Sequence, residues 1–170
     1  RMPILMPSST SRIPERFRPI VAIIPARGGS KRIKKKALQK FKPGASLLSK
    51  TIEQARTLRR KGWIDQVIVS SEDPRVRTVA GVVGQDEILV LARPPRLATD
   101  GASTLSVLRH LIRTQGLHKA TIVLLQVTSP LRSDGDVIDA LQEFFKGESD
   151  SVVSVTEAHP PPEWMFRLLK

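Results

Sequence analysis

Residues 20–25 read IVAIIP and are apolar throughout. A continuous apolar run of this length, rich in β-branched residues, is typical of a parallel strand that is buried on both faces. Similar short runs follow at residues 65–71, 88–91, 121–126 and 151–156, and each predicts a further strand. The sheet that these runs imply is therefore mostly parallel.

Stretches of helical period separate the predicted strands. They span residues 46–61, 73–84, 100–112 or 103–112 (beginning at Asp100 or at Ser103), and 133–146. The first ends in three cations, which complement the helix dipole, and Gly62 stops it. Alternating strands and helices predict an α/β fold with three layers, in which helices cover both faces of the sheet.

The composition is that of a globular domain. The 170 residues include 40% apolar and 26% charged side chains, and no apolar run approaches the roughly 18 residues that a membrane helix needs. Cysteine is absent, which excludes disulfides, thiolate nucleophiles and cysteine-ligated metals, and fits a cytoplasmic protein. Residues 1–18 lack the apolar core of a secretory signal, so we expect a flexible basic leader before one domain at residues 19–170.

The net charge of +12 is concentrated near the beginning of the chain. Residues 1–62 carry 17 Lys and Arg against 2 acidic residues, whereas residues 63–170 carry 11 against 14. A basic field of this kind attracts the phosphates of a nucleotide, a nucleic acid or an anionic lipid. Nucleic acid is the less favoured partner, because this segment offers only Phe17 and Phe41 for stacking on bases.

The loop after the first predicted strand has the composition of a phosphate-binding loop. In an open parallel sheet, ligands bind beyond the carboxyl ends of the strands. Residues 26–31 read ARGGSK, in which two glycines allow close approach of the backbone to an anion and two cations donate to phosphate oxygens. The spacing matches neither the P-loop nor the dinucleotide fingerprint, so a glycine turn with solvated cations is the alternative interpretation.

Other polar residues give less specific signals. Glu72-Asp73 precedes Pro74, which favours a helix cap over a metal ligand. The three histidines are too scattered along the chain to predict a metal site.

Five blocks of sequence resemble, in collinear order, the acylneuraminate cytidylyltransferases, or CMP-sialic acid synthetases. They read IPARGGSKRI (24–33), IVSSED (68–73), RPPRLATDGAST (93–104), LLQVTSPLR (124–132) and DSVVSVTEAH (150–159). The resemblance implies a nucleotide-diphospho-sugar transferase fold, CTP as co-substrate, Mg²⁺ as metal and a homodimer. In that family the anomeric hydroxyl of a nonulosonic acid such as N-acetylneuraminate attacks the α-phosphate of CTP and releases pyrophosphate.

The same resemblance implies roles for individual residues at the phosphate end of the site. Arg27 would contact the CTP phosphates, and Lys36 would lie against the triphosphate. The groups that would assist Arg27 follow it directly in the loop: the backbone N–H groups of Gly28, Gly29 and Ser30, and the side chain of Lys31.

At the nucleoside end, the resemblance implies that Arg93 and Thr104, with neighbouring Ser103, surround the cytosine and ribose. Gln126 would lie near the sugar acid and the reacting phosphate. Catalysis would then rest on Arg27, Lys36 and Gln126, chiefly through positioning and charge neutralisation. Asp100 is expected either as a helix N-cap or, by resemblance, as part of the substrate loop.

The chain also departs from the family pattern. Ala37 stands where the family has asparagine, Lys34 and Val127 stand where it has proline, and Arg96 stands where it has glutamate. The family's metal-binding aspartate pair and dimerisation segment are expected beyond Lys170, so the domain at 19–170 is expected to be incomplete and no metal ligand is predicted in it. Three hypotheses remain: a CMP-transferring cytidylyltransferase, an inactive nucleotide-binding homologue, and a basic nucleic-acid-binding module.

Overall fold

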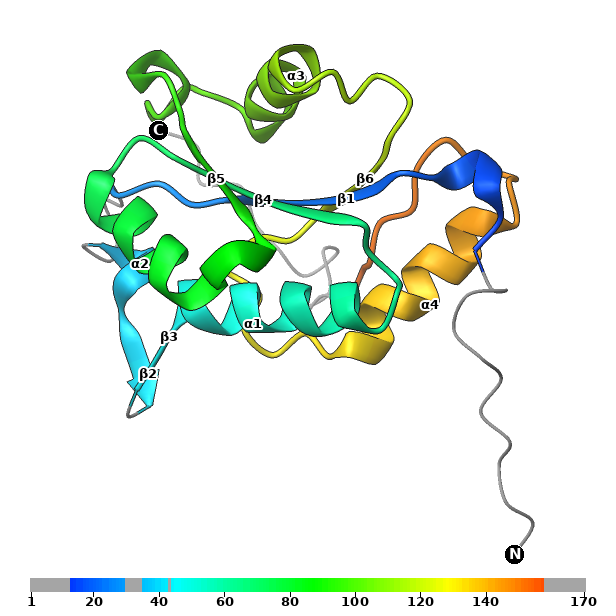
Figure 1. Ribbon diagram of the computed structural model, residues 1–170, viewed down its shortest axis with the longest axis horizontal. Helices are drawn as coiled ribbons and strands as arrows, with labels where there is room; N and C mark the ends of the chain where they lie inside the picture. Colours follow the sequence, from blue (N-terminus) through cyan, green and yellow to red (C-terminus); the bar gives the residue numbers. More distant parts are fainter. Residues whose placement is uncertain (1–12, 30–34, 43, 158–170) are drawn as a thin grey trace, which may run out of the picture. The chain divides into compact units, whose positions relative to one another are not determined.

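The computed structural model describes residues 13–29, 35–42 and 44–157 (Figure 1). The chain divides into two compact units, residues 1–134 and residues 135–170. The first unit holds the sheet and the helices that cover it. The second holds all but the first residue of helix α4 (Asp134–Phe145).

A four-stranded parallel sheet forms the centre of the first unit. Its strand order is β5-β4-β1-β6. Strand β1 (Ile20–Pro25) pairs with β4 (Gln66–Ser71) on one side and with β6 (Thr121–Leu124) on the other, and β4 pairs with β5 (Leu89–Ala92). Residues 20–24 of β1 are fully buried, which confirms the prediction from IVAIIP.

Helices cover both faces of this sheet, as the α/β prediction requires. Figure 1 shows α1 (Leu47–Arg60) and α2 (Pro74–Gly84) on one face and α3 (Thr104–Thr114) on the other. The apolar stripe of α1 is fully buried at Leu48, Ile52, Ala55 and Leu58. Three layers are therefore present, and the predicted fold class is confirmed.

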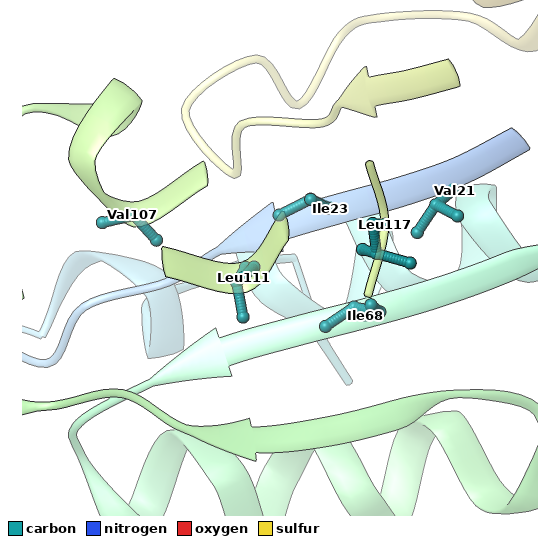
Figure 2. Close-up of a cluster of buried hydrophobic side chains, with 6 residues drawn as sticks. All are labelled: Val21, Ile23, Ile68, Val107, Leu111 and Leu117. Atoms are coloured by element: carbon teal, nitrogen blue, oxygen red, sulfur yellow. The ribbon is translucent and has the colours of Figure 1, made fainter. Parts of the chain in front are cut away.

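The layer between α3 and the sheet is an apolar cluster, shown in Figure 2. Because side chains alternate along a strand, β1 sends one set of residues toward α3 and the other toward the opposite face. The cluster consists of Val21, Ile23, Ile68, Val107, Leu111 and Leu117. It fixes α3 over the middle of the sheet and so places the beginning of α3 near the carboxyl ends of the strands.

Each of the three helices of the first unit has a side-chain cap at its N-terminus. Ser46 and Ser49 form a reciprocal capping box at α1, Asp73 accepts from the N–H of Arg75 at α2, and Ser103 accepts from the N–H of Ser106 at α3. The cap that was predicted at Asp73 is thus confirmed. Of the two starts considered for the third helix, Ser103 is the one that the structure adopts.

One predicted strand is wrong. Residues 151–157 form no strand, and Val153 and Val155 are 75% and 90% exposed. An alternating apolar pattern becomes a strand only when a neighbouring strand pairs with its backbone, and the described residues supply no such partner for this segment.

Short elements add to the predicted set. An antiparallel pair joins β2 (Lys40–Lys42) to β3 (Ala45–Ser46), with Gly44 in the turn at φ 78°. Short 3₁₀ helices lie at Glu15–Phe17, Lys36–Leu38, Gln85–Glu87 and Pro95–Leu97. The first of these falls inside the expected leader, of which residues 1–12 lie outside the described residues.

Candidate functional site

A cleft of about 550 Å³ opens at the carboxyl edge of the sheet. The chain proceeds from β1 to β4 on one side of β1 and later returns to β6 on the other side, so the loops after β1 and β6 diverge at this point. Such a switch in strand order is where open α/β sheets bind their ligands. The polar residues that line the cleft are Arg27, Lys36, Arg93, Thr99, Asp100, Thr104, Gln126 and Thr128.

Five of the residues predicted from the resemblance share this cleft: Arg27, Lys36, Arg93, Thr104 and Gln126. They come from the ends of β1, β5 and β6, from the 3₁₀ turn after the first loop and from the start of α3. Parallel strands explain the convergence, because their carboxyl ends lie at one edge of the sheet.

The other predicted residues have different positions. Ser103 is exposed and serves as the N-cap of α3, 3.1 Å from the N–H of Ser106, and it does not line the cleft. Gly28 and Gly29 lie in the loop after β1 but are not among the lining residues. Ser30 and Lys31 lie outside the described residues.

Arg27 makes its contacts with the loop before α3. Its guanidinium lies 3.1 Å from a carboxylate oxygen of Asp100 and donates to the backbone carbonyl of Thr99 at 3.3 Å. Because Ser103 caps α3, Asp100 is not the cap, and it lines the cleft instead. The pair joins the two loops that flank the cleft.

Arg93 is a buried cation at the end of β5. It is 6% exposed, and its Nη2 donates to Oε2 of Glu72 at 2.7 Å. Its Nε is buried and has no hydrogen-bond partner among the residues that the structure describes. Buried donors without a partner are uncommon in folded proteins.

Glu72, directly after β4, is a site residue that the sequence did not single out beyond a possible cap or metal ligand. Its Oε1 accepts from the backbone N–H of Gly28 at 2.8 Å while its Oε2 accepts from Arg93. Burial raises the pKa of Glu72, but the hydrogen bonds from Arg93 and from the backbone N–H of Gly28 lower it by more. The pKa of Glu72 therefore lies below its ordinary value. The carboxylate is therefore ionised at neutral pH.

Gly28 approaches the β4–α2 turn more closely than any other residue type could. A Cβ built at Gly28 would lie 2.0 Å from Oδ2 of Asp73 and 2.5 Å from its Cβ. Asp73 is itself fixed, because it caps α2 and forms a two-point ion pair with Arg75 that lowers the pKa of Asp73. The loop after β1 thus packs directly on residues 72 and 73.

Lys36 and Ala37 form another wall of the cleft, within the 3₁₀ turn Lys36–Leu38. Lys35 precedes this turn in the left-handed conformation, with φ 53°. Ala37 is 3% exposed, and its methyl group offers the cleft no hydrogen bond where the family pattern has an asparagine.

The described residues do not fit a protein-held metal ion. No group of three or more His, Asp or Glu side chains gathers anywhere in the part of the chain that the structure describes. The carboxylate of Asp100 in the cleft is paired with Arg27, and that of Glu72 is engaged by Gly28 and Arg93. The expected requirement for Mg²⁺ stays a prediction. In the same described residues, no helix is both long and apolar enough to cross a membrane.

The fold and the cleft define a doubly wound α/β protein with a ligand site at the switch in strand order. A family model described as "Cytidylyltransferase" matches residues 21–163. The chain therefore belongs to the cytidylyltransferase family.

Relatives with assigned activities match most of this chain. An N-acylneuraminate cytidylyltransferase of Escherichia coli is 36% identical over 147 residues, which is 85% of this chain and 33% of the relative. A pseudaminic acid cytidylyltransferase of Campylobacter jejuni is 32% identical over 87% of this chain and 62% of the relative. The chain thus spans between a third and two thirds of the length of these relatives.

A solved cytidylyltransferase structure from Leptospira borgpetersenii has the same fold. It superposes with a TM-score of 0.52 at 16% identity and covers 78% of this chain and 50% of that one. At this identity the likeness concerns the fold alone.

Proposed function

We propose that the chain carries the nucleotide-binding part of a nucleotidyltransferase that moves CMP from CTP to a sialic acid or a related nonulosonic acid. The observation that carries the proposal is the gathering of Arg27, Lys36, Arg93 and Gln126 around one cleft at the carboxyl edge of the sheet. Relatives that match most of this chain bear the names of CMP-transferring enzymes for such sugar acids.

Cations outnumber carboxylates among the described lining residues of the cleft, which favours an anionic ligand such as a triphosphate. Arg27, Lys36 and Arg93 line the cleft, and Asp100 is its opposing carboxylate among the described lining residues. The proposal places the triphosphate along Arg27 and Lys36 and the nucleoside toward Arg93 and Thr104. Cations that are already in place neutralise charge without reorganisation when the reaction occurs.

The reaction itself needs little covalent help from the protein. The oxygen of the anomeric hydroxyl forms a bond to the α-phosphorus, the bond from that phosphorus to the leaving pyrophosphate breaks, and the hydroxyl proton passes to water. Gln126, exposed at the end of β6, is proposed to orient the sugar acid through its side-chain amide. Positioning of this kind contributes a large share of catalysis in phosphoryl-type transfers.

Nucleotide binding without turnover is the second candidate. Ala37 removes the amide that the family pattern has beside the nucleotide, and the described residues offer no cluster of metal ligands. Binding and turnover are therefore measured separately.

The test combines CTP affinity by calorimetry with pyrophosphate release, using a panel of 2-keto sugar acids with and without Mg²⁺. Arg27→Ala is expected to weaken CTP binding at least tenfold, the loss typical of a hydrogen bond to a charged group. Arg113→Ala, which removes an exposed cation of α3 that does not line the cleft, is the matched control and should leave the affinity unchanged. Saturable CTP binding without pyrophosphate release would support the second candidate, and equal affinities for both variants would refute the role of Arg27.

A further inference from the structure

A single carboxylate, that of Glu72, joins the loop after β1 to Arg93, a residue of the cleft that is far from this loop in the chain. One oxygen accepts from the N–H of Gly28 at 2.8 Å, 44 residues earlier, and the other accepts from Arg93 at 2.7 Å, 21 residues later. The Arg93 and Glu72 side chains are 4% and 19% exposed. Water therefore competes weakly for these hydrogen bonds.

The strand order explains why Glu72 can reach both partners. Its strand, β4, lies between β1 and β5, so the residue that follows β4 is flanked by the loops that leave the two neighbours. Backbone hydrogen bonds continue past the strand ends on both sides, from Ala26 to Ser70 at 3.0 Å and from Arg93 to Ser71 at 3.0 Å. Arg77 of α2 stabilises the β4–α2 turn, because its Nη1 donates to the carbonyls of Ser71 and Glu72.

These contacts leave Glu72 with little freedom of its own. Its backbone is anchored by α2, and each of its two carboxylate oxygens has a donor. Movement of the loop at Gly28 would therefore disturb the carboxylate, and through it the guanidinium of Arg93.

We propose, on the basis of the proposed function, that Glu72 is a positioning residue that holds the Gly28 loop and Arg93 at one fixed spacing. The two ends of a nucleoside triphosphate, its phosphates and its base, are then bound together rather than independently. Glu72 acts through Gly28 and Arg93 and does not line the cleft itself. This assigns the residue after β4 a role in ligand binding besides the capping of α2 by its neighbour Asp73.

The first test uses the free protein and needs no ligand. Glu72→Gln keeps the size of the side chain but exchanges one acceptor oxygen for an NH₂ group. The remaining oxygen can accept the hydrogen bond of only one of the two donors, the N–H of Gly28 or the guanidinium of Arg93. NMR should show at least tenfold faster hydrogen exchange at the Gly28 amide, or a guanidinium resonance of Arg93 with the mobility of an exposed arginine. Glu53→Gln, at an exposed position on α1, is the matched control and should change neither signal.

The second test measures whether the two ends are coupled. We expect Glu72→Gln to raise the Kd for CTP about tenfold or more, and to raise the Kd values for cytidine and for tripolyphosphate by clearly smaller factors. Equal factors for CTP and tripolyphosphate would mean that Glu72 holds the loop alone, and would overturn the coupling. Unchanged Gly28 exchange together with a CTP affinity within twofold of the wild type would overturn the whole proposal.

Glu72→Asp keeps the charge but shortens the side chain, so it should lose less CTP affinity than Glu72→Gln. If Glu72→Gln does not fold, both tests use Glu72→Asp, and smaller changes in the same direction are expected. Failure of the wild type to bind CTP would refute the proposed function instead. In that case the exchange and guanidinium measurements on the free protein decide by themselves whether Glu72 holds both partners.

Discussion

Replacing Gly28 by alanine should distort the loop after β1, because there is no space for a side chain at this position. The added Cβ would lie 2.0 Å from Oδ2 and 2.5 Å from Cβ of Asp73. A change of rotamer could move Oδ2 away, but the Cβ of Asp73 is attached to the backbone and moves only with it. Either the loop or the first turn of α2 must therefore shift.

The cost can be worked from these contacts. Forcing an extra methyl group into a packed site costs about 1–3 kcal/mol. If Asp73 moves, its bond to the N–H of Arg75 at 2.8 Å is weakened, and loss of an N-cap costs about 1 kcal/mol. The expected loss in the free energy of unfolding is about 2–4 kcal/mol, equivalent to a decrease in Tm of roughly 5–15 °C for a chain of this size.

Gly29 provides the control, because a Cβ at that position meets nothing within 4 Å. Urea unfolding followed by circular dichroism should place Gly29→Ala within about 0.5 kcal/mol of the wild type. Adding Asp73→Gly to Gly28→Ala removes the clashing atoms, and glycine is a tolerated N-cap, so the double variant should be more stable than Gly28→Ala alone. Equal stability of Gly28→Ala and Gly29→Ala would refute the reasoning.

Three further predictions follow from the ion pairs and the core. Asp100→Asn should release Arg27 and tighten CTP binding by up to about fivefold, since exposed pairs are worth about 0–1 kcal/mol; weaker binding in calorimetry would show that Asp100 assists the ligand. The pKa values of Glu72 and Asp73 are lowered by their partners, so their contribution to stability is present above the unfolded pKa values, near 4.5 and 3.8, and is lost as the pH falls further. Urea midpoints between pH 3 and pH 7 should therefore fall less steeply for Glu72→Gln than for the wild type, and parallel profiles would contradict this. Leu111→Ala should cost about 2–5 kcal/mol in urea unfolding, because Leu111 is 2% exposed in the cluster under α3; a loss below 1 kcal/mol would show that the cluster is loosely packed.

The sequence predicted the part of the site that depends on strand ends. An apolar run such as residues 20–25 identifies a buried strand, and the polar residues that follow each strand must lie at one edge if the sheet is parallel. Arg27, Arg93 and Gln126 each follow a strand directly or within two residues, which is why they converge on the cleft. The predicted chemistry of these residues still awaits the binding experiments.

Features that depend on pairing in three dimensions could not be predicted in the same way. The alternating pattern of residues 151–156 indicates which side chains would share a face of a strand, but it does not indicate whether a neighbouring strand exists. In the structure this segment is not a strand. Glu72 looked like a helix-start residue, because its two partners are 44 and 21 residues away and no local spacing links them. A carboxylate directly after the middle of three adjacent strands was the available signal, and it becomes informative only once the strand order is known.

The large positive charge of the sequence is a weaker guide to the ligand than its size suggests. Several of the arginines are used inside the fold: Arg18 pairs with Asp65, Arg56 binds Glu87 and the carbonyl of Val83, and Arg77 holds the β4–α2 turn. These cations neutralise carboxylates or donate to partly buried carbonyls, so they contribute little to attracting a phosphate. The preference for an anionic ligand must then come from the few cations that are oriented by the carboxyl edge of the sheet. Glu72 offsets the charge of Arg93 but fixes the position of its guanidinium at the cleft, so its bearing on function lies in geometry and not in the net charge of the chain.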